Sequence, residues 1–379
     1  MSKALLPGST VGMLGGGQLG RMFALSARVL GYKVVVLEPD PHSPAAQCAD
    51  QHIQAAYDDE KALKIFGETC DVITTEFENI PAYVLNLLSG YCPVRPSANA
   101  VEKAQDRMVE KAFIKECGLL PVPYGEIHTE ADFQQALQEI QLPAILKTSR
   151  LGYDGKGQVV IHTEDELKSA FESVGKVPCV LEQRIDLDLE ISVVLARNIT
   201  GESQCFPVGE NIHKDGILYQ SIVPARADAD IADSAQAAAQ RIADKLDYVG
   251  VMAVEFFITK QGALLVNEMA PRTHNSGHYS QDACITSQFE QQVRMVCNLP
   301  FGDTRLLSPV VMTNLLGDVW GNSQPNWDKI LANPSSKLHL YGKKEARIGR
   351  KMGHFNTLST DAIEAKKCAD KIMQELTPC

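Results

Sequence analysis

A cluster of glycines between an apolar run and a helical pattern is the strongest constraint on the fold of this chain. The apolar run Val11–Leu14 is followed by Gly15–Gly20, with the spacing G-x-G-x-x-G, and by a helical pattern that ends at Gly31. A second apolar run, Val34–Leu37, comes next, so the order is strand, tight turn, helix and strand. Residues 71–75 add a further strand. This alternation predicts an α/β fold with a parallel sheet, whose functional edge lies at the carboxyl ends of its strands.

Acidic residues stand at those strand ends. Glu38 follows the second strand, and Glu76 and Glu78 follow the strand at residues 71–75. Glu38 lies about 20 residues after the glycine cluster, which completes the fingerprint of a dinucleotide-binding fold. Taken alone, this pattern predicts an NAD-dependent enzyme. Glycines at a strand-to-helix turn also serve other ligands that place a phosphate at a helix N-terminus, so both interpretations stay open at this point.

The charge balance limits the kinds of partner. The 379 residues include 36 Lys and Arg against 47 Asp and Glu, a formal net charge of −11. Binding to nucleic acid or to a membrane surface needs a broad basic surface, so we expect neither, whereas a site for one small anion is compatible with this balance. The ten cysteines show no CxxC and no metal-type spacing. That pattern, without a signal peptide or a long apolar run, predicts a cytoplasmic protein with reduced thiols.

The length and two changes of pattern predict three domains. At roughly 150 residues per domain, the chain is long enough for two or three. A helix that Ser97 caps and that continues through Cys117 leads into hairpins and short helices. From Ser308 onward come short strands and a final amphipathic helix at residues 361–376. We therefore expect domains at residues 1–103, 104–303 and 304–379.

A second glycine cluster, Gly152–Gln158, lies between two predicted strands near residues 144–148 and 158–161. A glycine loop between two strands is a hairpin-type lid, whose backbone can approach phosphates closely. Lys147 on the preceding strand can bring a positive charge to those phosphates. The alternative is a flexible surface turn with solvated lysines.

Two glutamates face each other in a predicted hairpin. A two-residue turn at Gln261-Gly262 pairs Lys260 with Ala263 and therefore places Glu255 opposite Glu268, with Cβ atoms about 5 Å apart. At an effective dielectric constant of about 20, the two carboxylates repel each other by about 3 kcal/mol. A shared Mg²⁺ ion would remove this repulsion, because hard cations prefer oxygen ligands. One protonated carboxyl group or an arginine partner would also remove it.

Three further segments carry polar side chains with less specific patterns. Glu182 and Glu190 flank a strand region that could hold a base and a ribose, or could equally be a solvated hairpin. The loop at residues 271–278 follows the second glutamate strand and is dense in anion-binding side chains. His213 stands alone, and its default interpretation is a structural or surface histidine.

Taken together, these residues resemble the ATP-grasp superfamily. More closely, four motifs spread from residue 11 to residue 354 resemble the 5-(carboxyamino)imidazole ribonucleotide synthetase family: residues 15–22 (GGGQLGRM), residues 152–158 (GYDGKGQ), residues 267–278 (NEMAPRTHNSGH), and residues 341–343 (YGK) with 349–351 (GRK). Ser149 and Leu151 depart from the family pattern, which has an arginine and a glycine there, and Ile348 stands in place of a proline.

The resemblance implies a fold and a reaction. The fold is α/β, an ATP-grasp domain with a Rossmann-like parallel-sheet domain before it and a small domain after it. The reaction is the ATP-dependent carboxylation of 5-aminoimidazole ribonucleotide (AIR) with bicarbonate, through carboxyphosphate, in purine biosynthesis. ATP and Mg²⁺, or Mn²⁺, are the implied cofactors, and a homodimer is the implied assembly. A different ATP-grasp ligase, such as a formate-dependent transformylase or a biotin carboxylase-like protein, and a non-catalytic nucleotide-binding protein are the alternatives.

The resemblance also implies roles for individual residues. The implied ATP contacts are Arg107, Lys147, Gly152, Tyr153, Asp154, Gly155, Lys156, Gly157, Gln158, Glu182, Gln183, Arg184, Ile185, Glu190, His213, Asn267 and Glu268. The implied catalytic residues are Arg272, His274 and Asn275, which form a cradle for bicarbonate and carboxyphosphate, together with Asp154 and Lys343. The implied AIR contacts are Gln18, Glu76, Tyr153, Asp154, Lys343 and Arg350, and the metal ligands are Glu255 and Glu268.

Overall fold

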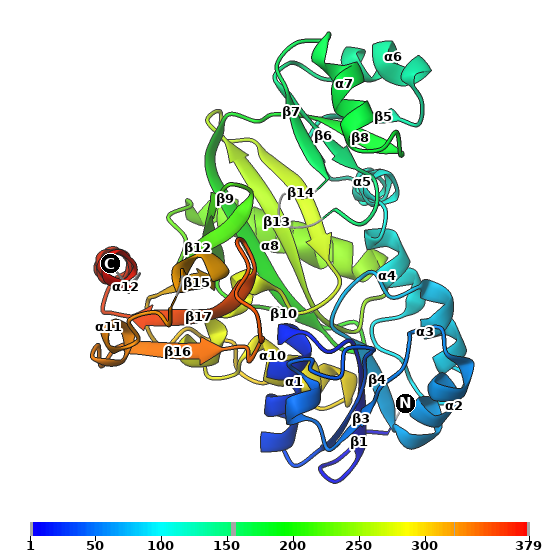
Figure 1. Cartoon of the computed structure of the whole chain (residues 1–379), viewed down its shortest axis with the longest axis vertical. Coiled ribbons are helices and arrows are strands. Elements are labelled where there is room, and N and C mark those ends of the chain that lie inside the picture. Colours follow the sequence, from blue (N-terminus) through cyan, green and yellow to red (C-terminus); the bar gives the residue numbers. More distant parts are fainter. Residues whose placement is uncertain (1–2, 153–156, 322, 377–379) are drawn as a thin grey trace.

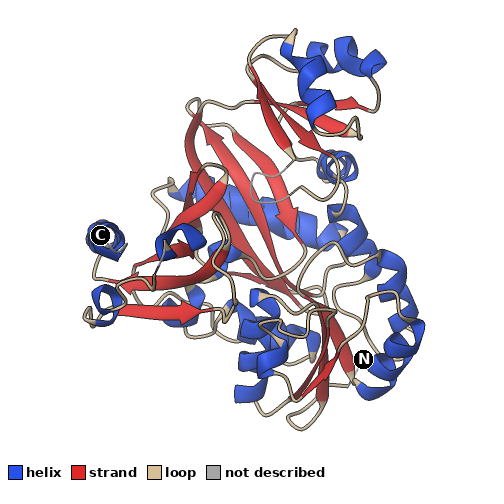
Figure 2. Cartoon of the chain, in the orientation of Figure 1, coloured by secondary structure: helices blue, strands red, loops and turns tan. Residues whose placement is uncertain are grey.

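The N-terminal part of the chain forms a parallel sheet, as the glycine cluster and the apolar runs predict. The computed structural model describes residues 3–152, 157–321 and 323–376 (Figures 1 and 2). The four strands have the order β3-β2-β1-β4 and are all parallel. The strands are β1 (Thr10–Leu14), β2 (Lys33–Leu37), β3 (Gln51–Ile53) and β4 (Val72–Thr75), and the helices of this part are α1 (Gln18–Val29), α2 (Glu60–Thr69) and α3 (Ala82–Leu88).

A small antiparallel sheet follows and lies at one end of the molecule (Figure 1). Its strand order is β5-β8-β6-β7. Two helices pack on it and bury side chains such as Leu146, Phe171 and Leu181. The elements are β5 (Tyr124–Ile127), α6 (Phe133–Gln138), β6 (Ala144–Thr148), β7 (Gln158–Ile161), α7 (Glu166–Ser173) and β8 (Cys179–Gln183).

A nine-stranded sheet forms the centre of the molecule (Figure 2). Its strand order is β14-β13-β9-β11-β12-β15-β17-β16, with β10 paired to β9. Strand β15 pairs with β12, so the C-terminal strands extend the central sheet rather than form one of their own. The strands are β9 (Leu187–Arg197), β10 (Ser203–Cys205), β11 (Gly209–Lys214), β12 (Ile217–Val223), β13 (Gly250–Thr259), β14 (Leu264–Ala270), β15 (Val310–Leu316), β16 (Ser336–Leu340) and β17 (Lys351–Leu358). The helices are α8 (Ala229–Lys245), α9 (Ser280–Ala283), α10 (Gln288–Val296), α11 (Asp328–Leu331) and α12 (Ala362–Leu376).

Helix α10 fixes the N-terminal sheet to the central sheet. Val293 and Val296 of this helix are buried in the same cluster as Phe23 of α1. Gln292 donates a hydrogen bond from Nε2 to Oγ1 of Thr74 at 2.9 Å, and its side chain is almost fully buried. These contacts bring the carboxyl ends of the N-terminal strands close to the central sheet.

The expectation of one long helix from Ser97 to Cys117 is wrong. The structure has two helices, α4 (Ala98–Ala104) and α5 (Arg107–Glu116). Asp106 adopts an extended conformation between them and accepts a hydrogen bond from the backbone N–H of Met108 at 3.0 Å. An aspartate in this position caps a new helix. The periodic spacing of apolar residues in the sequence therefore continues across Asp106, although the helix itself is interrupted there.

The predicted register of the glutamate hairpin is right at the glutamates and wrong at the turn. Phe256 pairs with Val266 and Ile258 with Leu264, one residue away from the register expected for a two-residue turn. A β-bulge beside Glu255 shifts the register by one residue, and Glu255 then pairs with Glu268 as predicted. The bulge therefore compensates for the different turn.

No helix in the described residues is long and apolar enough to span a membrane.

A buried ion-pair cluster ties α5 to the small sheet. The Nζ atom of Lys111, a fully buried residue of α5, lies 3.0 Å from Oε1 of Glu182. Lys147 of β6 donates from Nζ to Oε2 of the same carboxylate at 2.5 Å. Burial alone would raise the pKa of Glu182, but the two lysines outweigh it and lower this pKa to about 2.

This cluster makes the stability of the protein depend on pH. The folded-state pKa of Glu182 lies below its ordinary value of 4.5, so its contribution is complete above pH 4.5 and is lost as the pH falls toward 2. The difference in free energy of unfolding between the wild type and Glu182→Gln should shrink by on the order of 3 kcal/mol over that range, measured by urea denaturation. Glu172→Gln, at an exposed position, is the control and should show no such change. A difference for Glu182→Gln that stays constant with pH would contradict this account.

Candidate active site

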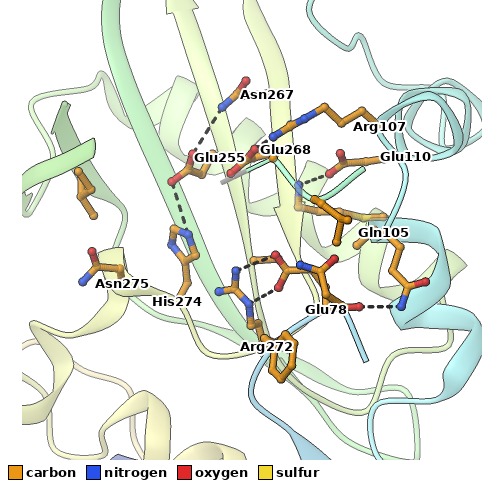
Figure 3. Close-up of a pocket in the computed structure, with 18 of the residues that line it drawn as sticks. Glu78, Gln105, Arg107, Glu110, Glu255, Asn267, Glu268, Arg272, His274 and Asn275 are labelled. Carbon is orange, nitrogen blue, oxygen red and sulfur yellow. Dashed lines mark hydrogen bonds and ion pairs between the residues drawn. The ribbon is translucent and has the colours of Figure 1, made fainter. Parts of the chain in front are cut away.

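Residues from all three sheets line one cavity of about 670 Å³ (Figure 3). Glu76 and Glu78 reach it from the end of β4, Lys147 from β6, and Glu255 and Glu268 from β13 and β14. The cavity also contains most of the other described residues that the family resemblance selects: Gln18, Arg107, Gly152, Gly157, Gln158, Glu190, His213, Asn267, Arg272, His274 and Asn275.

The glycine turn before α1 holds a carboxylate. Glu76 accepts hydrogen bonds from the backbone N–H groups of Gly17 and, at 2.7 Å, of Gly20. A Cβ atom at Gly17 would lie 2.7 Å from the Glu76 carboxylate, so a larger residue there would displace this carboxylate. Burial raises the pKa of Glu76, although these hydrogen bonds oppose the shift. Because a side-chain carboxylate occupies the place where a dinucleotide fold binds its pyrophosphate, the geometry argues against the nicotinamide interpretation.

The paired glutamates differ in how their charges are compensated. Arg107 donates from Nη1 to Oε2 of Glu268 at 3.1 Å, and Arg107 and Lys147 lower the pKa of Glu268 against the effect of burial. Burial, followed by the charges of Glu190 and Glu268, raises the pKa of Glu255 to about 8. Both alternatives to a cation that the sequence left open, an arginine partner and a protonated carboxyl group, are therefore present.

The same residues fit a bound Mg²⁺ ion. Asn267 donates from Nδ2 to Glu255 at 3.5 Å, and its Oδ1 atom is buried without a hydrogen-bond partner among the described residues. Glu255, Glu268 and Asn267 thus offer oxygen atoms in one cavity, and oxygen is the ligand type that Mg²⁺ prefers. A cation would also stabilise the ionised form of Glu255, which the surrounding carboxylates disfavour.

A glutamate and a histidine extend this cluster. Nδ1 of His213 lies 3.0 Å from Oε2 of Glu190. Glu190, His213 and Glu255 each bring one ligand atom to within 4.8 Å of the others. Burial lowers the pKa of His213, but the hydrogen bond and the charge of Glu190 outweigh this effect and raise it. His213 is therefore part of the polar cavity, and its default interpretation as a structural or surface residue does not hold.

The loop after β14 brings an arginine and a neutral histidine to the cavity. Arg272 forms a two-bond ion pair with Glu78. Burial and the charge of Arg272 lower the pKa of His274 well below its usual value, so this ring is neutral at pH 7. The backbone N–H of Ser276 donates to its Nδ1 atom at 3.3 Å. The ring proton is therefore assigned to Nε2, which lies 3.8 Å from Oε1 of Glu255.

The Asn275 side chain is paired with the C-terminal part of the central sheet. Its Nδ2 group donates to Oδ1 of Asn314 at 3.0 Å, and Asn314 donates back to Oδ1 of Asn275 at 2.7 Å. Asn314 lies on β15 and also donates to the carbonyl of Leu218 at 2.7 Å. Asn275 lines the cavity, and its second amide N–H has no acceptor among the described residues.

Several expected nucleotide contacts lie apart from the main cavity. The Glu182 carboxylate is paired with Lys111 and Lys147 and is not among the described residues that line the main cavity. Gln183, Arg184 and Ile185 line a second cavity of about 280 Å³. Tyr153, Asp154, Gly155 and Lys156 lie outside the described residues.

Of the expected AIR contacts, Gln18 and Glu76 line the main cavity. Lys343 donates from Nζ to Oε1 of Gln18 at 2.6 Å and to the carbonyl of Lys351 at 2.7 Å. Arg350 donates to the carbonyl of Glu345 at 3.0 Å. Lys343 and Arg350 are not among the described residues that line the cavity, whereas Lys351 is.

The sequence analysis assigned no role to several residues that line the cavity, among them Glu78, Gln105, Glu110 and Lys351. The sequence analysis noted Glu78 at the end of a strand and Lys351 in the motif at residues 349–351, but gave neither residue a function. Glu110 is buried and accepts a hydrogen bond from the backbone N–H of Met269 at 2.6 Å. Burial and the nearby charge of Glu268 raise the pKa of Glu110 to about 8. Its only sequence signal is an acidic residue on the apolar face of a helix.

Comparisons with protein families match three consecutive parts of the chain. Residues 8–105 match the ribonucleotide synthetase preATP-grasp domain, residues 112–289 the ATP-grasp domain, and residues 310–368 the phosphoribosylaminoimidazole carboxylase C-terminal domain. These matches confirm the expected fold class, in which a parallel-sheet domain precedes an ATP-grasp domain and a small domain follows it.

Two relatives that match nearly the whole chain carry the same name. The N5-carboxyaminoimidazole ribonucleotide synthase of Bacillus subtilis is 44% identical over 378 residues, which cover 100% of this chain and 97% of that protein. The protein of the same name from Brucella melitensis is 46% identical over 362 residues, 95% of this chain and 99% of that protein.

Solved structures agree with these matches. The ADP complex of an N5-carboxyaminoimidazole ribonucleotide synthetase superimposes with a TM-score of 0.93 at 44% identity and covers 98% of each chain. The Aspergillus clavatus enzyme in complex with ADP and AIR superimposes with a TM-score of 0.89 at 28% identity, covering 98% of this chain and 99% of that one. Relatives above 40% identity over nearly the whole length, and the same three domains in the same order, show that this chain belongs to the N5-carboxyaminoimidazole ribonucleotide synthase family of ATP-dependent ligases.

Proposed function

We propose that the protein carboxylates AIR with bicarbonate at the expense of ATP in this cavity. Three groups of side chains that line the cavity each bind one of the three substrates. The observation that carries this proposal is the convergence of the three sheets on one cavity. The side chains of the small sheet and of β9, β11, β13 and β14 suit the nucleotide. The loop after β14 suits bicarbonate, and the end of the N-terminal sheet suits AIR.

The reaction needs its substrates to be positioned and their negative charges to be compensated. Bicarbonate is a poor electrophile at carbon, so an oxygen of bicarbonate first takes the γ-phosphoryl group of ATP and carboxyphosphate forms. ADP is the leaving group of that transfer. The exocyclic amine of AIR then attacks the carboxyl carbon and displaces phosphate, or attacks CO₂ after carboxyphosphate has released phosphate, and in either case the amine loses a proton. Phosphoryl transfer depends mainly on alignment and on stabilisation of charge, which is what Lys147, Arg107 and Arg272 can supply.

The neutral His274 suits the bicarbonate part of the cavity. With its proton on Nε2, the ring can donate a hydrogen bond to an anion without adding a second full charge beside Arg272. Arg272 supplies the charge, and the spare N–H of Asn275 supplies another donor. We infer that these three side chains hold bicarbonate and then carboxyphosphate.

Glu255, Glu268 and Asn267 would hold Mg²⁺. When bound, the ion neutralises charge on the phosphates of ATP during phosphoryl transfer. On the AIR side, Gln18 and Glu76 lie at the glycine turn and Lys343 is hydrogen-bonded to Gln18. Exclusion of water from the cavity would protect carboxyphosphate, which water hydrolyses.

We also propose an oligomeric state and a cellular location for the protein. The family resemblance supports a homodimer that works in the cytoplasm. The nine cysteines in the described part of the chain are all free thiols, which fits a reducing compartment.

The proposed reaction predicts that ADP release depends on AIR. Purified protein with Mg·ATP and bicarbonate should release ADP much faster when AIR is added, because phosphoryl transfer to bicarbonate is productive only with the acceptor in place. A coupled ADP assay with and without AIR, with glycinamide ribonucleotide as the control acceptor, measures this. ADP release that follows the control acceptor rather than AIR would favour a different ATP-grasp ligase.

Removal of the Arg272 side chain should affect the chemistry and spare nucleotide binding. Arg272→Ala should lower product formation roughly 100-fold, the usual effect of deleting one group that stabilises charge in a reaction. Its dissociation constant for ATP should stay within about twofold of the wild-type value, measured by calorimetry. Arg226→Ala, which removes an exposed arginine that is not among the described residues lining the cavity, is the control. A large loss of ATP affinity in Arg272→Ala would overturn the assignment to bicarbonate.

Binding of Mg²⁺ with ADP should release a proton from Glu255. With a pKa of about 8 this carboxyl group is mostly protonated at pH 7, and a ligated carboxylate is ionised, so close to one proton should leave at pH 7 and almost none at pH 9. Calorimetry in two buffers with different ionisation enthalpies counts the protons. Glu255→Gln corrects for protons released by the nucleotide itself. Equal proton release by the wild type and Glu255→Gln would contradict the proposed ligand role.

A further inference from the structure

Glu78 holds the guanidinium of Arg272 from a different part of the chain (Figure 3). Nε of Arg272 donates to Oε2 of Glu78 at 2.5 Å, and Nη2 donates to Oε1 at 3.1 Å. The two side chains are 19% and 24% exposed, so water screens the pair only partly. Burial would raise the pKa of Glu78, but Arg272 lowers it below its usual value. Glu78 is therefore ionised at neutral pH, and the pair is a charged one.

The ion pair with Glu78 limits which N–H groups of Arg272 an anion can contact. Glu78 occupies the Nε side of the guanidinium, and Nη1 donates to the carbonyl of Thr273 at 3.3 Å. A guanidinium has five N–H groups, and with the Nη2 bond to Glu78 these contacts leave two without an acceptor in the part of the chain that the structure describes, one on each Nη nitrogen. An anion such as bicarbonate can therefore approach only from the Nη end.

The backbone around Glu78 is held at both ends. Nε2 of Gln105 donates to the carbonyl of Glu78 at 2.7 Å and to the carbonyl of Ile80 at 2.6 Å. Two residues before Glu78, the Glu76 carboxylate accepts hydrogen bonds from Gly17 and Gly20. A segment of three residues thus joins the glycine turn, which is the candidate AIR site, to the arginine of the candidate bicarbonate site.

We propose that Glu78 is a positioning residue that directs the Nη end of Arg272 toward bicarbonate. It thereby fixes the position of bicarbonate relative to AIR. The proposal rests on the proposed function. Glu78 acts through Arg272 and contacts no substrate itself. When the pair is broken, Arg272 is free to rotate, carboxyphosphate is held away from the amine of AIR, and more of it is lost to water.

Glu78→Gln tests this role, because the amide keeps the size of the side chain and loses the charge and one of the two acceptor oxygens. We expect at least a tenfold lower kcat for AIR carboxylation, a higher KM for bicarbonate, and less carboxylated product per ADP released. The KM for ATP should stay within about twofold. Glu210→Gln makes the same change in another glutamate–arginine pair, Glu210–Arg226, away from the cavity, and should leave all four quantities within about twofold.

A double mutant separates action through Arg272 from a direct or merely structural role. If Glu78 acts through Arg272, Glu78→Gln combined with Arg272→Ala should be no slower than Arg272→Ala alone. Multiplied effects in the double mutant would overturn the proposal, as would a Glu78→Gln enzyme with the wild-type kcat and product ratio. If Glu78→Gln does not fold, Glu78→Asp, which keeps the charge but shortens the reach, should show the same losses to a smaller degree, and wild-type kinetics there would also overturn it. A wild-type protein without AIR-dependent ADP release would instead refute the proposed function.

Discussion

Several carboxylates lie around one cavity and repel one another, and the ion pairs that compensate their charges also hold the sheets together. Glu78, Glu190, Glu255 and Glu268 all line that cavity, and each needs compensation for its charge. Glu268 is paired with Arg107, Glu78 with Arg272 and Glu190 with His213. Burial and the charges of Glu190 and Glu268 raise the pKa of Glu255 to about 8, and a bound cation would favour its ionised form. The basic side chains of the cavity therefore compensate fixed carboxylates.

This compensation also connects the separate sheets. Arg107 from α5 contacts β14, and Lys111, one helical turn further, contacts β8 of the small sheet. Glu78 at the end of β4 contacts Arg272 after β14. Because ion pairs between buried groups lose much of their stabilisation when one partner is displaced, the sheets cannot move far apart without exposing or isolating a charge. The contacts that hold the three sheets together are thus the same contacts that place charged side chains around the cavity.

The sequence predicted the parts of the site that local patterns encode, and it did not predict the parts that depend on tertiary pairing. The pattern at residues 11–37 predicted the parallel sheet correctly, because the alternation of strands with helices and the glycines of the turn are local signals. The Glu255–Glu268 pair was predicted correctly, although the turn was wrong, since a bulge restored the register. The break at Asp106 was missed because the apolar period continues across it. Glu78 was recognised at a strand end, but its partner lies 194 residues away and no local pattern specifies that contact.

We propose that the γ-phosphoryl group of ATP is transferred to bicarbonate in this cavity in the presence of AIR. The most direct test uses bicarbonate labelled with ¹⁸O and mass spectrometry of the phosphate produced. If an oxygen of bicarbonate attacks phosphorus, each phosphate released with the carboxylated product carries one ¹⁸O atom from bicarbonate. Phosphate that contains oxygen only from ATP and water would contradict the account, because it would mean that ATP is hydrolysed without activation of bicarbonate.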